Sequence, residues 1–242
     1  AQASFEPCMA KSTYGTGCFV MVNTGETAVK SKHRLLSTIL YRIHGKTHYA
    51  LEGSIFNAGA AVKWLCDSLN MIAAPAETES LAKSLKSNEG VYLVPAFTGL
   101  GAPYWNPDAR GAMFGITRAT GRAHFARAVL EAVCYQSRDL FQAIQSDDVS
   151  LKAIRVDGGM TENQWLLQFL ADIVDVQVER SACIEATALG AAYLAGLQVG
   201  MFSSLTDIAS RWQKTATYDS QMDESCRQSL YTGWQNALKQ LV

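Results

Sequence analysis

Short apolar segments alternate along this chain with longer stretches whose apolar residues recur at helical spacing. Five short segments are rich in β-branched and other apolar residues, and Gly, Pro or polar clusters bound each of them. This pattern predicts strands. The predicted strands cover residues 18–22, 46–52, 91–94, 153–157 and 176–179.

Between and after these strands, apolar residues three and four positions apart predict five helices. They cover residues 54–69, 123–144, 164–174, 186–197 and 224–241. The helix over 186–197 is rich in Ala and Gly, which favours close packing against a sheet or another helix. Mixed strands and helices of this kind indicate an α/β layered fold. The longest irregular stretch, residues 95–110, exceeds the usual loop length, and long loops are more often functional than idle.

Composition narrows the range of partners. Of the 242 residues 48% are hydrophobic and 18% are charged, and the formal net charge is -1. This balance favours neither nucleic acid nor an anionic membrane as the main partner. No apolar run reaches the roughly 20 residues of a membrane span. The six cysteines form no CxxC pair, so we expect reduced thiols and a cytoplasmic protein. Because the chain starts with Ala1 rather than Met, we expect a fragment of a longer protein.

The segment YGTGCF at residues 14–19 places Thr16 between two glycines immediately before a predicted strand. Such a turn can direct backbone N–H groups and a hydroxyl at a phosphate, because glycine lets the backbone approach closely. The segment lacks the lysine of a P-loop, so it is not a Walker site. From the residues alone, a plain tight turn explains it as well.

The segment VDGG ends a predicted strand at Gly158 and Gly159, and Asn163 follows just before a predicted helix. Ligands of open α/β sheets bind where a strand ends and a helix begins. An adenine ring needs a slot with little side-chain bulk, which a pair of glycines provides. A nucleotide edge and a structural turn are both compatible with this segment.

Two further segments leave their roles open. Small residues around Gly59 begin the predicted helix over 54–69, either for close packing or for a ligand, and Lys63 one turn later faces a phosphate or water. The aromatic residues of the loop at 97–105 form either a lid or a plug in the core. The histidines lack metal-ligand spacing with Cys or carboxylates, and no GxSxG nucleophile segment occurs. We therefore expect no metal site built by this chain alone.

Several segments together resemble the FGGY carbohydrate kinases. GAMFGI at 111–116 followed by HFARAVLE at 124–131 is similar to the C-terminal signature of that family. Six further segments resemble the glycerol kinases within this family, namely YGTGCF, NTGE, YALEG, VPAFTGLGAPYW, RVDGG and TALGAAYLAGL. The resemblance covers about residues 9–200 and is weak over 69–86. It implies the C-terminal, nucleotide-binding half of a two-domain sugar kinase, with an actin-like, ribonuclease-H-like ATPase fold over residues 1–242 and the N-terminal domain absent.

The resemblance also implies a reaction, its cofactors and its partners. ATP would transfer its γ-phosphate to glycerol with Mg²⁺, giving sn-glycerol 3-phosphate and ADP, and the full-length enzyme would form a homo-oligomer. The catalytic base would be an aspartate in a GDQ-type segment upstream of Ala1. We therefore expect no catalytic residue in this chain and no activity from the fragment alone.

Site residues carry over from the resemblance position by position. Thr16 would contact the ATP phosphates, Gly159 and Asn163 would line the adenosine site, Gly158 would support that turn, and Gly59 would border the nucleotide. Phe19 would form an apolar wall against the glycerol carbons. Lys63 is a departure, because the resemblance leads us to expect glutamine there.

Two other functions remain open from the sequence. One is an FGGY kinase for another acceptor, such as xylulose, ribulose or erythritol. The other is a non-catalytic nucleotide-binding module. The glycerol-type loop at 97–105 favours glycerol over a pentulose, and an upstream aspartate in a GDQ-like context would separate a kinase from a module.

Overall fold

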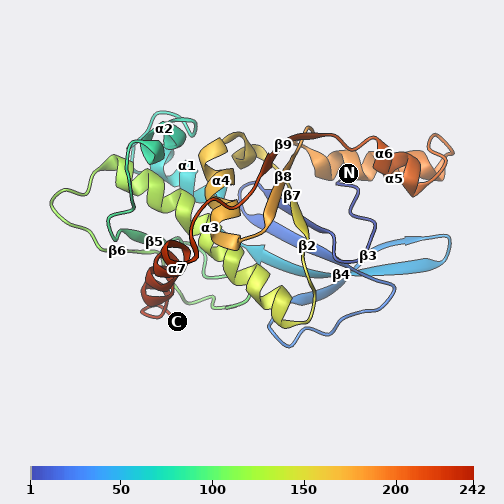
Figure 1. Ribbon diagram of the computed structural model, residues 1–242, viewed down its shortest axis with the longest axis horizontal. Coiled ribbons are helices and arrows are strands. Elements are labelled where there is room, and N and C mark those ends of the chain that lie inside the picture. Colours follow the sequence, from blue (N-terminus) through green and yellow to red (C-terminus); the bar gives the residue numbers. More distant parts are fainter. Residues whose placement is uncertain (1) are drawn as a thin grey trace.

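The computed structural model describes residues 2–242, which form a seven-stranded mixed sheet with helices around it (Figure 1). The strand order is β3-β4-β2-β1-β7-β8-β9. β1 pairs with β7 and β7 with β8 in parallel, whereas the other neighbours in the sheet are antiparallel. The strands of this sheet are β1 (Ala10–Tyr14), β2 (Cys18–Gly25), β3 (Leu36–Ile43), β4 (Lys46–Ile55), β7 (Ala153–Asp157), β8 (Gln177–Ser181) and β9 (Lys214–Tyr218).

One face of the sheet carries the core. Strand β2 alternates, with Val20 and Val22 fully buried and Phe19 exposed, as expected for a strand with one packed face. The helix α3 (Arg122–Ser146) packs on that face together with α4 (Gln164–Val174). The Tyr14 hydroxyl of β1 lies 3.0 Å from the Ser137 hydroxyl of α3, which joins the two layers inside the core.

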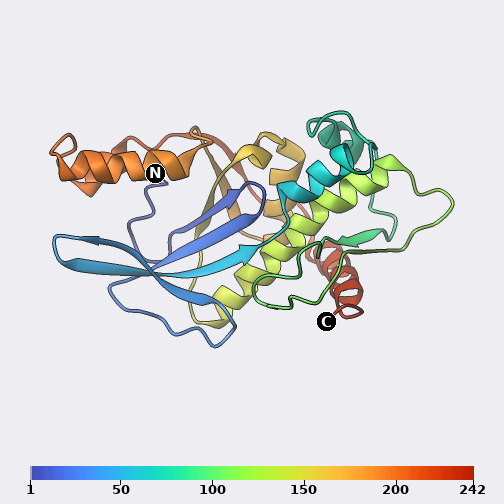
Figure 2. The same cartoon turned by 180° about the vertical axis from the view of Figure 1, so that it is seen from behind.

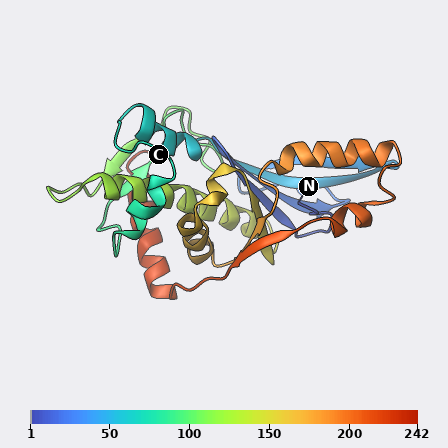
Figure 3. The same ribbon diagram turned by 90° about the horizontal axis from the view of Figure 1, so that it is seen from above.

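The opposite face is covered only in part. Lys11, Thr13 and Met21 lie on it, and residues 2–5 and the helix α5 (Ala186–Gln198) cover them. Only Ala186 and Gly196 of α5 are buried. From above, α5 lies alongside the hairpin of β3 and β4, at the end of the molecule away from α7 (Glu224–Leu238) (Figure 3). The remaining short elements are α1 (Gly59–Asp67), α2 (Glu77–Lys83), α6 (Leu205–Ser210), the 3-10 turn Gly159–Glu162, and a second sheet of β5 (Tyr92–Val94) and β6 (Ala112–Phe114).

The α/β prediction is confirmed, and the strand at 153–157 and the helix at 164–174 have the predicted bounds. The predicted start of the helix at residue 54 is wrong. Ser54 and Ile55 still pair with β2, so β4 continues to Ile55 and α1 begins at Gly59. Seven elements were not predicted, namely β1, β3, β6, β9, α2, α6 and the 3-10 turn Gly159–Glu162.

The loop at 95–110 packs against the body of the protein. The Phe97 ring lies 4.9 Å from that of Trp64, and the Trp105 indole N–H donates to the Arg34 carbonyl at 2.6 Å. The Ala102 amide donates to the carbonyl of Ser54 at 3.0 Å. These contacts decide between the two alternatives for its aromatic residues, because the loop is a plug and not a lid. No helix within residues 2–242 has the length and apolar character to cross a membrane.

A buried carboxylate holds α7 against α3. Asp139 accepts hydrogen bonds from the Tyr231 hydroxyl at 2.6 Å and from the Trp234 indole N–H at 3.0 Å. Burial raises the pKa of Asp139 to about 6, against the opposing effect of these hydrogen bonds. The folded chain therefore holds this proton more tightly than the unfolded chain does.

We expect this carboxylate to make stability depend on pH. Because the pKa is raised on folding, its contribution is complete below about pH 4 and is lost as the pH rises through about 6. Asp139→Asn cannot titrate, so its free energy of unfolding relative to wild type should rise by about 3 kcal/mol between pH 4 and pH 7. Urea unfolding of both proteins across this range measures the difference. A difference that does not change with pH would contradict the assignment.

Candidate functional site

A cavity of about 960 Å³ lies where four segments meet. These are the turn between β1 and β2, the start of α1, the start of α2, and the 3-10 turn that leads into α4. Seen from behind, α1 and α2 lie beside α4 at one end of the sheet (Figure 2). Of the residues singled out in the sequence, Thr16, Gly59, Lys63, Gly159 and Asn163 line this cavity.

The turn between β1 and β2 is fixed to the beginning of α1 by backbone hydrogen bonds. The Thr16 carbonyl accepts from the amides of Ala58 and Ala60, each at 3.0 Å, and the Gly59 amide donates to the Gly15 carbonyl at 2.9 Å. A Cβ on Gly59 would lie 2.6 Å from the Gly15 oxygen, so only glycine permits this approach. Thr16 is exposed at the cavity. The segment is thus a tight turn that also presents a hydroxyl residue to the cavity.

The two glycines after β7 have different roles. Gly158 has φ +95°, and a Cβ there would lie 2.3 Å from the Tyr14 carbonyl oxygen, so this position requires glycine. It does not line the cavity. Gly159 does line it, and among residues 2–242 no atom outside its immediate neighbours lies within 4 Å of the position that a Cβ would take. Bulk added at Gly159 would therefore enter open space at the cavity.

Asn163 connects α4 with α2. It is the N-cap of α4, because its side-chain oxygen accepts from the Leu166 amide at 2.9 Å, and its side-chain NH₂ donates to the Thr78 hydroxyl at 3.3 Å. The free amides and the dipole at a helix N-terminus favour anionic groups. The cavity thus combines glycine surface, which suits a flat ring, with helix termini, which suit an anion.

Lys63 lies on the rim of the cavity with its side chain 77% exposed. Its Nζ is 3.8 Å from the Asp67 carboxylate, one helical turn away, and such exposed pairs contribute little to stability. The lysine is therefore free to turn toward a ligand, although its present contact is with Asp67 and solvent.

Phe19 lies outside this cavity. Its side chain is half exposed on the open face of the sheet, and its register partners are Thr13 on β1 and Ser54 on β4. Phe19 is the second residue of β2 and lies three residues after Thr16, so it belongs to the strand that begins at the cavity-lining turn. The position fits contact with a molecule or domain that covers this face.

One wall of the cavity was missed in the sequence. Pro75, Ala76, Thr78 and Glu79 line it from the start of α2. Local signals were present, since a proline shortly before two acidic residues in a first turn is typical of a helix N-terminus. The helix is too short for its periodicity to be visible, and the family resemblance is weak in this segment.

Carboxylates near the cavity do not converge on one point. Asp67, Glu79 and Glu162 line it. In the part of the chain that the structure describes, no three His, Cys, Asp or Glu residues are grouped to hold a metal ion. The arrangement is therefore suited to binding a ligand rather than to holding a metal by side chains of this chain alone.

Comparison with known proteins gives three consistent findings. The family model for the FGGY family of carbohydrate kinases, C-terminal domain, matches residues 10–199. A glycerol kinase from Coxiella burnetii is 57% identical over 241 residues, covering 100% of this chain and 48% of that protein. Glycerol kinase 1 from Pseudomonas aeruginosa is 55% identical over 240 residues, covering 99% of this chain and 49% of that protein.

Solved structures agree with the sequence relatives. The crystal structure of Plasmodium falciparum glycerol kinase with ADP has a TM-score of 0.91 and 40% identity, and covers 100% of this chain and 48% of that one. A xylulose kinase from Lactobacillus acidophilus has a TM-score of 0.81 at 22% identity, covering 98% of this chain and 48% of that one, which shows the shared fold alone. The chain spans about half the length of the curated relatives it matches.

Proposed function

Because this chain belongs to the FGGY family of carbohydrate kinases, in its C-terminal domain, we propose that it is the nucleotide-binding half of an enzyme that phosphorylates glycerol with ATP. The fold is that of the actin-like ATPases, as the sequence led us to expect. The observation that carries the proposal is the cavity lined by Thr16, Gly59, Gly159 and Asn163, in a chain whose fold matches a glycerol kinase solved with ADP.

Each cavity residue receives a specific part in this proposal. Thr16 contacts the phosphates of ATP, Gly59 borders the nucleotide, and Gly159 and Asn163 line the adenosine. Gly158 supports the turn without touching the ligand, in keeping with its φ of +95° and its place outside the cavity lining. Lys63 approaches the nucleotide from the rim, and Phe19 contacts the carbons of glycerol from the open face of the sheet.

Phosphoryl transfer depends mainly on in-line positioning, charge neutralisation and a base near the attacking hydroxyl. We assign the in-line positioning in part to this chain, which holds the donor nucleotide as magnesium–ATP. An N-terminal domain supplies the base and most contacts to glycerol. Closure of the two domains excludes water, so that ATP is not simply hydrolysed.

The direct test of this function is ADP release by the chain extended with its N-terminal half. Magnesium–ATP is supplied with glycerol, dihydroxyacetone, xylulose or ribulose as acceptor. The proposal requires a strong preference for glycerol and no turnover by the 242-residue chain alone. Preference for a pentulose would reject the acceptor but keep the nucleotide site, and absence of acceptor-dependent release would favour a non-catalytic binding module. Glycerol is favoured over pentuloses here because the glycerol kinases from Coxiella burnetii and Pseudomonas aeruginosa are 57% and 55% identical to this chain, whereas the xylulose kinase, at 22%, shares only the fold.

Gly159→Leu is expected to abolish most nucleotide binding without unfolding the protein. The added side chain would extend into open space at the cavity, where the ligand is proposed to lie. ADP affinity, measured by calorimetry, should fall by roughly 100-fold, comparable to the loss of about 3 kcal/mol of contacts. The free energy of unfolding should change by less than about 1 kcal/mol.

Gly121→Leu provides the matched control for that substitution. Gly121 precedes α3 and does not line the cavity. As at Gly159, a Cβ added to Gly121 would meet no atom of residues 2–242 within 4 Å, apart from its immediate neighbours. Its ADP affinity should equal that of wild type. Equal ADP affinity for Gly159→Leu and wild type would place the nucleotide elsewhere.

Two properties of the full-length protein complete the proposal. Self-association is supported by the edge strand β3, on which the side chains of Leu36 and Ile39 are exposed. A cytoplasmic location is supported by six free cysteines.

A further inference from the structure

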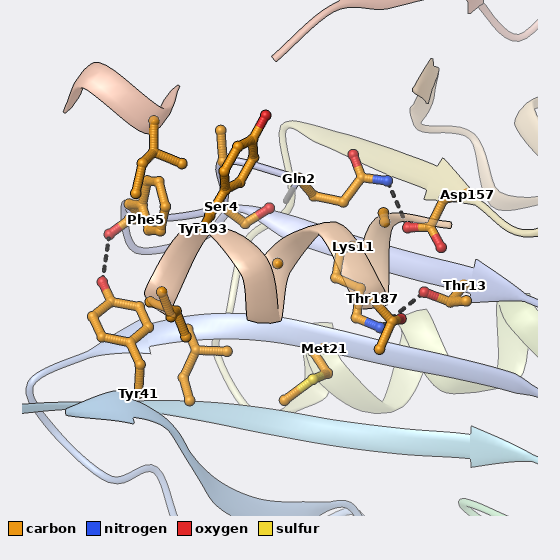
Figure 4. Close-up of a pocket in the computed structure, with 16 residues that line it drawn as sticks. Gln2, Ser4, Phe5, Lys11, Thr13, Met21, Tyr41, Asp157, Thr187 and Tyr193 are labelled. Atoms are coloured by element: carbon orange, nitrogen blue, oxygen red, sulfur yellow. Dashed lines mark hydrogen bonds between the residues drawn. The ribbon is translucent and has the colours of Figure 1, made fainter. Parts of the chain in front are cut away.

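A second cavity, of about 310 Å³, lies on the open face of the sheet (Figure 4). Residues 2–5 and α5 enclose it, and Figure 4 shows Tyr193 and Tyr41 toward one end and Asp157 at the other. Most of its lining is apolar, but Lys11, Thr13 and Asp157 provide polar groups. None of the residues proposed to bind nucleotide or glycerol lines this cavity.

Asp157 is the last residue of β7 and directly precedes the turn that lines the nucleotide cavity. It is 1% exposed, and its Oδ2 accepts a hydrogen bond from the Gln2 side-chain NH₂ at 2.6 Å. Its Oδ1 is buried and has no hydrogen-bond partner within residues 2–242. A buried carboxylate oxygen without a donor is costly, so this arrangement indicates a donor that has yet to be supplied.

Gln2 is fixed on both sides of this contact. Its side-chain oxygen accepts from the Trp212 indole N–H at 2.9 Å, and its backbone carbonyl accepts from the Arg155 guanidinium at 2.6 Å. The hydroxyl of Ser4, two residues on, is a second buried polar atom that lacks a partner among the described residues. Both orphaned atoms belong to residues that line the second cavity.

We propose that Gln2 and Asp157 are positioning residues that connect the nucleotide turn to the N-terminal half of the protein, which places a hydrogen-bond donor in the second cavity against Oδ1 of Asp157. The inference rests on the proposed function, since it assumes the nucleotide site and the two-domain enzyme. Through this contact, closure of the N-terminal half and nucleotide binding by this chain are coupled.

Three observations point to the N-terminal half as the occupant. The chain corresponds to the C-terminal half of its relatives, so the missing half joins it through the segment that precedes residue 2. Residues 2–5 form a wall of the second cavity, which brings that junction to its rim. Most of α5 is not buried, and Leu194, which lines the cavity, is itself exposed, so the opposite wall also has surface left to cover.

The geometry explains how such a contact would reach the nucleotide. Gly158 follows Asp157 and packs on the Tyr14 backbone so closely that a Cβ would lie 2.3 Å from the Tyr14 oxygen. Its amide also donates to the Ile184 carbonyl at 3.1 Å. A displacement of Asp157 is therefore transmitted to Gly159 rather than absorbed. By linkage, a donor that binds Asp157 only when the halves close strengthens nucleotide binding, and nucleotide strengthens closure equally.

The test compares ADP dissociation constants in two contexts, the 242-residue chain and the chain extended with its N-terminal half. Asp157→Asn retains the shape of the side chain but replaces one acceptor oxygen by a donor, so it cannot accept from both Gln2 and an incoming group. In the extended protein this variant should bind ADP at least about 10-fold more weakly than wild type. In the 242-residue chain, where the contact is not made, its affinity should stay within about twofold of wild type.

Two further variants keep the test decisive. Gln2→Ala leaves Asp157 intact but removes the donor to its Oδ2 in both contexts, so it should weaken ADP binding more in the extended protein than in the 242-residue chain, and it replaces Asp157→Asn if that protein fails to fold. Lys214→Ala removes an exposed ion pair with Glu179 on the neighbouring sheet edge and should match wild type in both contexts. Equal weakening of ADP binding in both contexts would show a purely local role for Asp157. No weakening in either context would show that Asp157 has no role in ADP binding. Either result would overturn the inference. Wild-type protein that binds no ADP in either context would instead reject the proposed function.

Discussion

Replacing Glu131 by alanine is expected to lower the free energy of unfolding by about 3–5 kcal/mol, because it leaves a buried positive charge without its partner. The Arg127 guanidinium donates to the Glu131 carboxylate at 2.6 Å, and the Tyr135 hydroxyl donates to it at 2.9 Å. Glu131 is 1% exposed and Arg127 is 8% exposed. Water cannot take the place of the missing carboxylate without opening the core.

Urea unfolding measures this effect, and Glu79→Ala is the matched control. Glu79 also pairs with a base four residues away, Lys83, but that pair is at the surface and should contribute less than about 1 kcal/mol. The double substitution Arg127→Met with Glu131→Leu should recover much of the loss, because it removes both charges together. A loss below about 1 kcal/mol for Glu131→Ala would show that the ion pair is not buried in solution.

This ion pair lies within a segment on which the family resemblance rests. Arg127 and Glu131 both belong to HFARAVLE, and the Arg127 guanidinium donates to the Leu85 carbonyl at 2.7 Å, after the end of α2. The pair thus connects α3 with the segment that follows α2, and α2 lines the larger cavity. These contacts give this part of the signature a structural role in the chain.

Gly158→Ala is expected to have the second large effect, a loss of about 3 kcal/mol or more of stability together with weaker ADP binding. At φ +95° an alanine is strained, and its Cβ would lie 2.3 Å from the carbonyl oxygen and 2.7 Å from the carbonyl carbon of Tyr14. Because these are backbone atoms of the central strand β1, they cannot move aside independently. The displaced turn would carry Gly159 away from the cavity.

Thermal unfolding and ADP titration of the purified variant measure both effects. Gly159→Ala is the control one position along, since its Cβ meets no atom within 4 Å outside its immediate neighbours in the described chain, and it should keep wild-type stability within about 1 kcal/mol. A Gly158→Ala protein as stable as wild type would mean that the backbone at this turn differs from the one described here.

The parts of the fold that the sequence predicts are those with local, regular patterns. The helix α4 carries a strong apolar face that begins directly after an N-cap asparagine, so its start is visible in the sequence. Strand β3 was missed because it is an edge strand in which no residue is buried, so it lacks the alternation of a half-buried strand. Strand β9, with the sequence KTATY, carries too few apolar residues to be distinguished from a loop.

The candidate site was predicted in part for a similar reason. Glycine-rich turns next to strands are visible in sequence, and the structure brings those at residues 15–17 and 158–159 to the same end of the sheet through the pairing of β1 with β7. The buried carboxylates could not be recognised. Asp139, Asp157 and Glu131 look like surface residues in sequence, and the partners that show their burial include residues as distant as Gln2 and Trp234.

Hydrogen–deuterium exchange with and without ADP tests most directly whether this chain is a nucleotide-binding half. We expect slower exchange at residues 15–17, 58–63, 75–79 and 159–163, which border the larger cavity from four separate segments. Residues 186–194, which line the second cavity, should be unaffected in the 242-residue chain. Protection confined to residues 186–194, or no protection at any of these segments at saturating ADP, would contradict it.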